Sequence, residues 1–209
     1  MTPAGTDVPI SGSAGTCWDW VLLLPPGWVR MPTAAAAGRR AVAAMLDRRL
    51  RHLPRDQIAG GRRRLEQELR QQLAAARASG ASEVYAQVDL VHGMPVSAGL
   101  TVGRLQVGGD DESLMKGLTA LLGAAGDVVA CEPATVGGVP ALRRRRRFLR
   151  AVADGTPALP QTAVDWVVPL PDSDDVLVLA FATSTEQIAD ALVALFDAIA
   201  MSLELTPRA

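Results

Sequence analysis

The sequence predicts an α+β fold in which an antiparallel sheet is flanked by helices on both faces, an α/β/α sandwich. Three observations lead to this prediction. The C-terminal segment 164–205 has the pattern strand, turn, strand, helix. Nearly all predicted strands are joined by short turns, which antiparallel neighbours allow and parallel neighbours do not. Amphipathic helices lie between the strands and supply apolar faces that must cover the sheet.

The N-terminal segment 1–16 is rich in Pro, Gly, Ser and Thr and lacks the basic start and apolar core of a secretory signal. We therefore expect it to be disordered and expect residues 17–209 to form one domain. The first strand is predicted at Trp18–Leu24 and ends at the turn Pro25-Pro26-Gly27.

Two amphipathic helices come next. Residues 35–52 place apolar side chains on one side and several arginines on the other, and this helix should stop near Pro54. Residues 62–79 repeat leucine every four positions, with Arg and Glu spaced for ion pairs on the wet face, and Gly80 ends the helix. Segment 35–79 is therefore expected to be a helical insertion in the domain.

The middle of the chain predicts a hairpin followed by a helix. Residues 84–91 and 96–107 alternate well enough to be two strands joined by a short turn. Asp110 or Asp111 can cap a helix that runs through about Leu122 and buries a stripe of leucines.

A further hairpin is predicted from strands 127–135 and 139–152. They flank Val136-Gly137-Gly138, where glycine permits the positive φ angles that tight hairpin turns require.

The C-terminal unit begins with the alternating strand Val164–Leu170. The next strand, Val176–Phe181, is apolar without alternation, so we expect both of its faces to be covered. Thr183 with Glu186, or Ser184 with Gln187, has the spacing of a capping box. A helix of about nineteen residues should follow.

Composition fits a globular protein: the chain has 209 residues, is 49% hydrophobic and has a formal net charge of −1. Charge is nevertheless segregated. Segment 30–80 holds twelve arginines against four acids, a net of +8, whereas segment 154–209 holds one arginine against nine acids, a net of −8. The two can neutralise each other within the fold or in a homodimer, or they can steer a charged partner.

Five consecutive arginines form the sharpest local feature: Arg143, Arg144, Arg145, Arg146 and Arg147. On a strand their side chains alternate between the two faces, so we expect a strand that is not buried on both sides. In one interpretation these guanidinium groups form a patch for phosphate or another anionic partner. In the other they belong to an exposed edge strand and bind acids on neighbouring strands, such as Glu132.

Residues that could support catalysis are sparse. His52 and His92 lie near no nucleophile motif, and neither belongs to a pair with metal-ligand spacing. Cys17 and Cys131 are wrongly spaced for a zinc site, and we interpret them as reduced thiols. The glycines show no nucleotide-binding fingerprint. From the histidines, cysteines and glycines together, we predict no catalytic residue, no cofactor and no metal.

The segments Leu24-Pro25-Pro26-Gly27-Trp28 and Ile199-Ala200-Met201-Ser202-Leu203 resemble the two ends of the PsbP-like superfamily, in an uncharacterised actinobacterial branch. The resemblance covers about a third of the chain. It implies an antiparallel sheet between helical layers and a role in binding or assembly. It carries over no functional residue.

The sequence therefore does not reveal a specific function. Because it shows no catalytic set, we expect a non-enzymatic protein-interaction or assembly module. Its partner should be another protein, with a homodimer as one form, while the balanced charge argues against nucleic acid. No window is long and apolar enough for a membrane span, so we expect a cytoplasmic protein. The alternatives are a binder of anionic ligands or nucleic acid through Arg143–Arg147, and an enzyme of unrecognised type.

Overall fold

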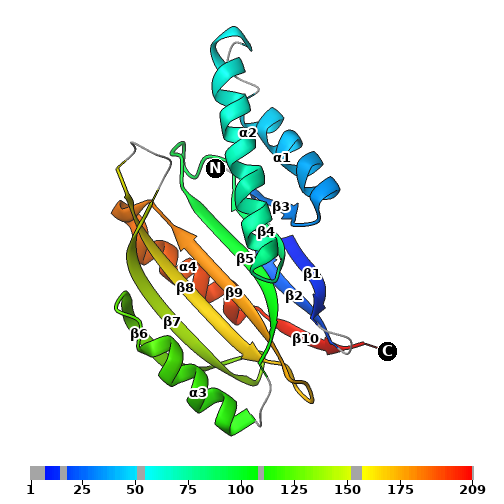
Figure 1. Cartoon of the computed structure of the whole chain (residues 1–209), viewed down its shortest axis with the longest axis vertical. Helices are drawn as coiled ribbons and strands as arrows, with labels where there is room; N and C mark the ends of the chain where they lie inside the picture. Colours follow the sequence, from blue (N-terminus) through cyan, green and yellow to red (C-terminus); the bar gives the residue numbers. More distant parts are fainter. Residues whose placement is uncertain (1–7, 15–17, 51–54, 108–110, 152–156, 209) are drawn as a thin grey trace. The chain divides into compact units, whose positions relative to one another are not determined.

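The computed structural model describes residues 8–14, 18–50, 55–107, 111–151 and 157–208. They fall into two compact units. Unit 1 combines the chain up to Pro26 with the chain from Arg104 onward, and unit 2 runs from Gly27 to Gly103 (Figure 1). The helices and strands confirm the α+β class. The predicted helical insertion does not stand alone, because it belongs to unit 2 together with strands on either side of it.

The larger sheet of unit 1 contains four antiparallel strands in the order β9-β8-β7-β6. Their bounds are β6 (Val128–Val136), β7 (Val139–Arg150), β8 (Leu159–Pro169) and β9 (Asp175–Thr183). The register pairs Arg143 of β7 with Trp166 of β8, and Trp166 with Leu179 of β9. Both predicted hairpins of this region are present; β6 and β7 lie within two residues of their predicted bounds, whereas β8 and β9 are longer than the sequence indicated.

A second sheet of unit 1 joins the two ends of the chain, in the order β1-β2-β10. Its strands are β1 (Val8–Ala14), β2 (Trp18–Leu24) and β10 (Glu204–Pro207). The prediction that residues 1–16 are disordered is wrong for Val8–Ala14, because they pair with β2 along its whole length. The remaining residues of that segment lie outside the described part of the chain.

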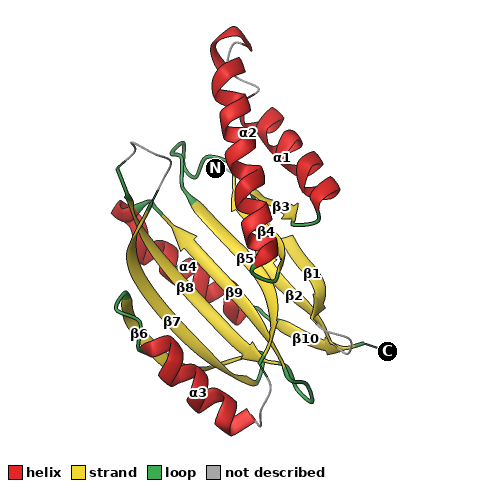
Figure 2. Ribbon diagram, viewed as in Figure 1, coloured by secondary structure: helices red, strands yellow, loops and turns green. Residues whose placement is uncertain are grey.

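Helices cover both faces of the larger sheet (Figure 2). Helix α3 (Asp111–Gly123) packs on β6 and β7 on one face, with Leu118 and Leu122 against Leu142. Helix α4 (Ala189–Met201) packs on β8 and β9 on the other, where Phe196 stacks on Phe181 at 5.1 Å between ring centroids. Unit 1 is therefore layered as predicted.

The burial of β8 and β9 is the reverse of what the sequence pattern indicated. Residues 162–169 of β8 are continuously buried, whereas β9 alternates between buried and half-buried positions. The alternation in β8 was misleading because Asp165, a polar residue in the pattern, is itself buried.

The capping box predicted before α4 is wrong. The hydroxyl of Thr183 accepts a hydrogen bond from the N–H of Thr185 at 3.0 Å, and Glu186 binds Thr162 and Arg147 instead. A short 3-10 helix, η1 (Glu186–Ile188), comes first, and α4 itself has only thirteen residues, because it begins after η1 and ends at Met201.

Unit 2 contains strands β3 (Trp28–Pro32), β4 (Ala81–Gln87) and the first part of β5 (Ala98–Gln106), in that order and antiparallel. Helices α1 (Ala35–Leu50) and α2 (Arg55–Ala78) pack on β3 and β4. The core between them is apolar and includes Met31, Val42, Met45, Leu46 and Leu73. Strand β3 was not predicted, because it is only five residues long and the prolines around it are typical of a turn.

Candidate functional site

An apolar groove lies in unit 1 between α3 and the hairpin formed by β6 and β7, and it extends to the end of β8. Its main hollow has a volume of about 630 Å³. The lining residues are Met115, Lys116, Gly138, Val139, Pro140, Pro169, Leu170 and Pro171. An adjoining hollow of about 560 Å³ shares Met115, Lys116 and Pro140 and continues along α3 past Pro133 and Ala134. We call the two together the α3 groove.

The walls of the α3 groove are aliphatic and proline-rich. Among its described lining residues Lys116 alone is charged, and the hydroxyl of Thr119 already donates to the carbonyl of Met115 at 2.7 Å. One wall of the groove is formed by Pro169, Leu170 and Pro171. This wall is held in place because Trp18 Nε1 donates to the carbonyl oxygen of Pro171 at 2.8 Å. Such a surface binds apolar groups by removing their area from water and offers few hydrogen bonds.

Sequence reasoning did not find this groove. The leucine stripe of α3 was expected to be buried, and Leu118 and Leu122 do pack on the sheet, but Leu121 is exposed. The groove joins residues of α3, the turn at Gly138 and the end of β8. In the sequence, only the run Pro169-Leu170-Pro171 could have indicated the groove, and that run by itself is typical of the end of a strand.

The five arginines of β7 form an arginine ladder, defined as Arg143–Arg147. The expectation of an edge strand is wrong, because β7 pairs with β6 on one side and β8 on the other. Both faces of the strand carry helices, and the long side chains reach carboxylates on either side.

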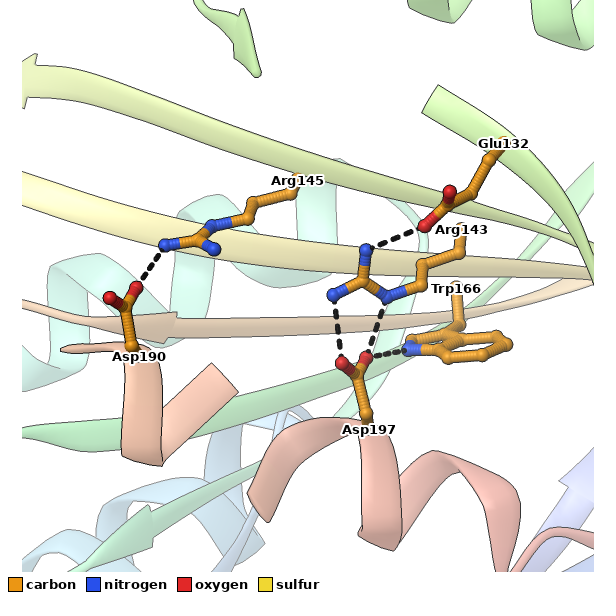
Figure 3. Close-up of polar contacts among 6 residues, drawn as sticks. All are labelled: Glu132, Arg143, Arg145, Trp166, Asp190 and Asp197. Carbon is orange, nitrogen blue, oxygen red and sulfur yellow. Dashed lines mark hydrogen bonds and ion pairs between the residues drawn. The ribbon is translucent and has the colours of Figure 1, made fainter. Parts of the chain in front are cut away.

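On the α4 face, Arg143 makes a two-pronged contact with Asp197, with Nε and Nη2 at 2.8 and 2.7 Å from its oxygens (Figure 3). Trp166 Nε1 also donates to Asp197, and Glu132 binds the remaining side of Arg143. The hydrogen bonds that Arg143 donates to Asp197 are the main cause that raises the pKa of Arg143. This guanidinium is therefore held as a cation.

The side chains of Arg145 and Arg147 also lie on the α4 face. Arg145 binds Asp190 at 2.5 Å, and Arg147 binds Glu186 at 2.9 Å. The Nε of Arg145 is buried and has no hydrogen-bond partner among the described residues, so this guanidinium binds Asp190 through Nη2 alone (Figure 3).

On the α3 face, Arg144 and Arg146 share the buried carboxylate of Asp165, at 2.8 and 2.9 Å. Arg144 also reaches the carbonyl of Leu122 at the end of α3 at 3.5 Å. Arg146 also pairs with Asp127 at 3.3 Å. Burial lowers the pKa of Arg146, but the hydrogen bonds and charges of Asp165 and then Asp127 outweigh it and leave that pKa raised. All five arginines therefore have carboxylate partners within unit 1. The prediction that they bind an anionic partner stays a prediction.

Unit 2 contains a buried polar cluster that sequence reasoning missed. Glu83 is buried on β4 and receives hydrogen bonds from the hydroxyl of Tyr85 and from Arg30. Burial, then the hydrogen bond to Glu83 and its charge, raises the pKa of Tyr85 well above its ordinary value. The alternation in β4 places residues 83 and 85 on one face, but a glutamate in that pattern gives no sign of burial.

The remaining reactive residues do not assemble into a catalytic set within the described part of the chain. Cys131 lies beside Leu142 under α3, and burial is the main cause that raises the pKa of its thiol, which disfavours the nucleophilic thiolate. His92 sits in a turn with φ of 49°. Cys17 and His52 lie outside the described residues. Among the residues that the structure describes, no three His, Cys, Asp or Glu side chains lie together in a group that could hold a metal ion.

No protein-family model matches the chain, and no curated protein matches it. Among solved structures, the chain is similar to the crystal structure of LpqN, a protein involved in cell envelope biogenesis of Mycobacterium tuberculosis. The two share 13% sequence identity at a TM-score of 0.51, over 96% of this chain and 91% of that chain. At that identity the likeness shows a shared fold. Membership of the PsbP-like superfamily stays a prediction.

None of the described helices combines the length and the apolar character needed to cross a membrane.

Proposed function

We propose that this chain is a non-enzymatic binding module and that the α3 groove receives an aliphatic segment of a partner protein. The observation that carries the proposal is the groove itself. A hollow of about 630 Å³ falls within the range of known ligand sites, and its walls are apolar with one charged residue at hand.

The shape of the groove favours a segment of chain as its occupant. The adjoining hollow extends the groove along α3, so its length suits several consecutive side chains. Addition of a strand to the outer edge of β6 is less suitable, because Pro133 offers no N–H there and proline on an edge strand discourages pairing.

The likeness to LpqN supports this proposal at the level of fold. LpqN is described as involved in cell envelope biogenesis, which is consistent with a non-enzymatic role. The arginine ladder is a poorer binding surface than the groove, because each of its five guanidinium groups already pairs with a carboxylate that an incoming anion would have to displace.

Fluorescence titration of the full chain with the apolar dye N-phenylnaphthylamine tests the groove. We expect saturable binding that Val139→Phe weakens about tenfold, because the larger ring fills the hollow. Val129→Phe is the matched control: Val129 lies on β6, is exposed and lines neither hollow, so binding should change less than about twofold.

Equal effects of the two substitutions, or the absence of saturable binding, would contradict the groove as the binding site. Tight binding of free fatty acyl chains, with no binding of aliphatic peptides, would replace the protein partner by a small molecule. Turnover of a substrate that Val139→Phe abolishes would replace the binding module by an enzyme.

A further inference from the structure

A second concavity lies within unit 2, between helices α1 and α2, and has a volume of about 290 Å³. We call it the α1–α2 pocket. Its lining residues are Thr33, Ala35, Gly38, Arg39, Arg70, Leu73, Ala74 and Arg77. Three of the eight are arginines, and no carboxylate is among them.

The floor of the α1–α2 pocket is apolar and fixed. Leu73 is buried in the core of unit 2, and Gly38 is pressed so closely on β3 that a Cβ there would lie 2.7 Å from the carbonyl oxygen of Pro32. The hydroxyl of Thr33 donates to the carbonyl oxygens of Ala81 and Ser82, so it is already used. Polar recognition in this pocket therefore falls to the arginines.

The described acids of unit 2 pair with one of the three arginines in this pocket and leave the other two without an ion pair. Each acid whose side chain is described in residues 27–103 forms an ion pair with a different arginine. The pairs are Asp47–Arg62, Glu66–Arg70, Glu68–Arg64, Glu83–Arg30 and Asp89–Arg48. Only one of these five arginines, Arg70, lines the pocket.

Arg39 and Arg77 consequently remain without an acidic partner among the described residues, although they face the same pocket from different helices. Arg63, Arg70 and Arg77 are spaced seven residues apart, which places them along one face of α2. An adjoining hollow along that face is lined by Arg63, Glu66, Gln67, Arg70, Gln71 and Ala74, so it adds two amide groups beside the pocket and also the carboxylate that pairs with Arg70.

Convergent cations without a counter-charge repel one another, and an oxyanion removes that repulsion. A guanidinium group binds phosphate with two parallel N–H donors, and several of them can surround one phosphate group. We propose that the α1–α2 pocket binds the phosphate group of a ligand, with Arg39 and Arg77 as the main contacts and Arg70 as the third. The small volume suits a phosphate group rather than a whole nucleotide.

Calorimetric titration of the full chain with inorganic phosphate, at constant ionic strength with chloride as the reference anion, tests the pocket. We expect saturable phosphate binding that the double substitution Arg39→Gln/Arg77→Gln weakens at least about tenfold, because two charge-assisted contacts are lost. Arg40→Gln is the matched control, since Arg40 is an exposed neighbour on α1 that does not line the pocket; its effect should stay below about twofold.

Vesicles of phosphatidylcholine with and without phosphatidic acid distinguish the source of the phosphate. Binding that requires phosphatidic acid and is competed by inorganic phosphate assigns the pocket to a lipid headgroup. Phosphate binding without vesicle binding assigns it to a soluble phosphate ester. The proposal is overturned if phosphate binds no better than chloride, or if Arg40→Gln weakens binding as much as the double substitution does.

Discussion

Asp165 is the residue on which the arginine ladder depends most. Its carboxylate is buried, with 4% of the side chain exposed, and it faces two guanidinium groups from the same strand. Ion pairs that are out of water are strongly destabilised when one partner is removed, because the remaining charge stays buried. Glu132 offers a contrast in the same network, because it is mostly exposed and Arg143 keeps Asp197 without it.

We therefore expect Asp165→Ala to lower the free energy of unfolding by about 3–5 kcal/mol, because Arg144 loses its carboxylate partner and Arg146 keeps only Asp127. Glu132→Ala should cost less than about 1 kcal/mol. Urea unfolding of both variants measures the difference. Equal losses would show that the two carboxylates are equivalent and that burial of Asp165 has no energetic role.

Tyr85 predicts how stability depends on pH. It is the single tyrosine of the chain, and its pKa in the folded state is raised above the ordinary value of 10.0, first by burial and then by Glu83. Above about pH 10 the unfolded chain has lost the phenolic proton while the folded chain retains it. The unfolded state then binds fewer protons, so the free energy of unfolding falls as the pH rises. Below about pH 10 this group contributes no pH dependence.

Ultraviolet absorbance of tyrosinate during an alkaline titration measures this directly. We expect ionisation of Tyr85 to coincide with loss of structure. In Tyr85→Phe the part of the alkaline destabilisation due to this residue should disappear. Ionisation at the ordinary pKa in a chain that is still folded would contradict the buried cluster with Glu83.

At the scale of single elements, the hairpin between β6 and β7 shows where glycine is required. Gly137 and Gly138 have φ of 56° and 80°, as the sequence predicted for this turn. Their surroundings differ, because a Cβ on Gly137 would lie 2.7 Å from the carbonyl oxygen of Leu203, whereas a Cβ on Gly138 would meet no atom within 4 Å.

Gly138→Ala should therefore destabilise by about 1 kcal/mol, the cost of a positive φ for an alanine. Gly137→Ala should cost at least about 1 kcal/mol more, because the added methyl group also clashes with a backbone carbonyl. Thermal or urea unfolding of the two variants gives the comparison. If the two substitutions cost the same, the chain around Leu203 does not lie against this turn.

The elements that the sequence predicted well are those with a strong local period. Helix α1, strand β2 and the hairpin at Gly137-Gly138 were found within a few residues of their bounds, because apolar spacing and turn glycines act over short distances. Strands β1 and β10 were missed. They are stabilised mainly by pairing with β2, a partner that no local pattern reveals.

The candidate sites could be predicted far less well, for the same reason. The arginine ladder was visible as a run, but its acidic partners come from β6, β8, η1 and α4 and could not be assigned beyond Glu132. The α3 groove and the α1–α2 pocket are each formed by residues that are distant in sequence and chemically ordinary one at a time. Only the tertiary arrangement brings them together.

At the scale of the whole molecule, a net charge near zero conceals two opposite charges. Unit 2 contains twelve arginines against six acids, a net of +6, and the rest of the chain contains nine cations against sixteen acids, a net of −7. Within unit 1 the five arginines of the arginine ladder pair with acids, whereas unit 2 has more arginines than acids. An anionic ligand is therefore expected at unit 2, and an apolar one at unit 1.

The central claim is that the α3 groove is the binding site of this module, and methyl NMR of the methionine-labelled full chain tests it most directly. Met115 lines both hollows of the groove, whereas Met201 and Met94 are exposed elsewhere. On titration with N-phenylnaphthylamine, we predict that the Met115 methyl resonance shifts saturably and that those of Met94 and Met201 do not move. A shift of Met94 or Met201 with Met115 unchanged would contradict the account.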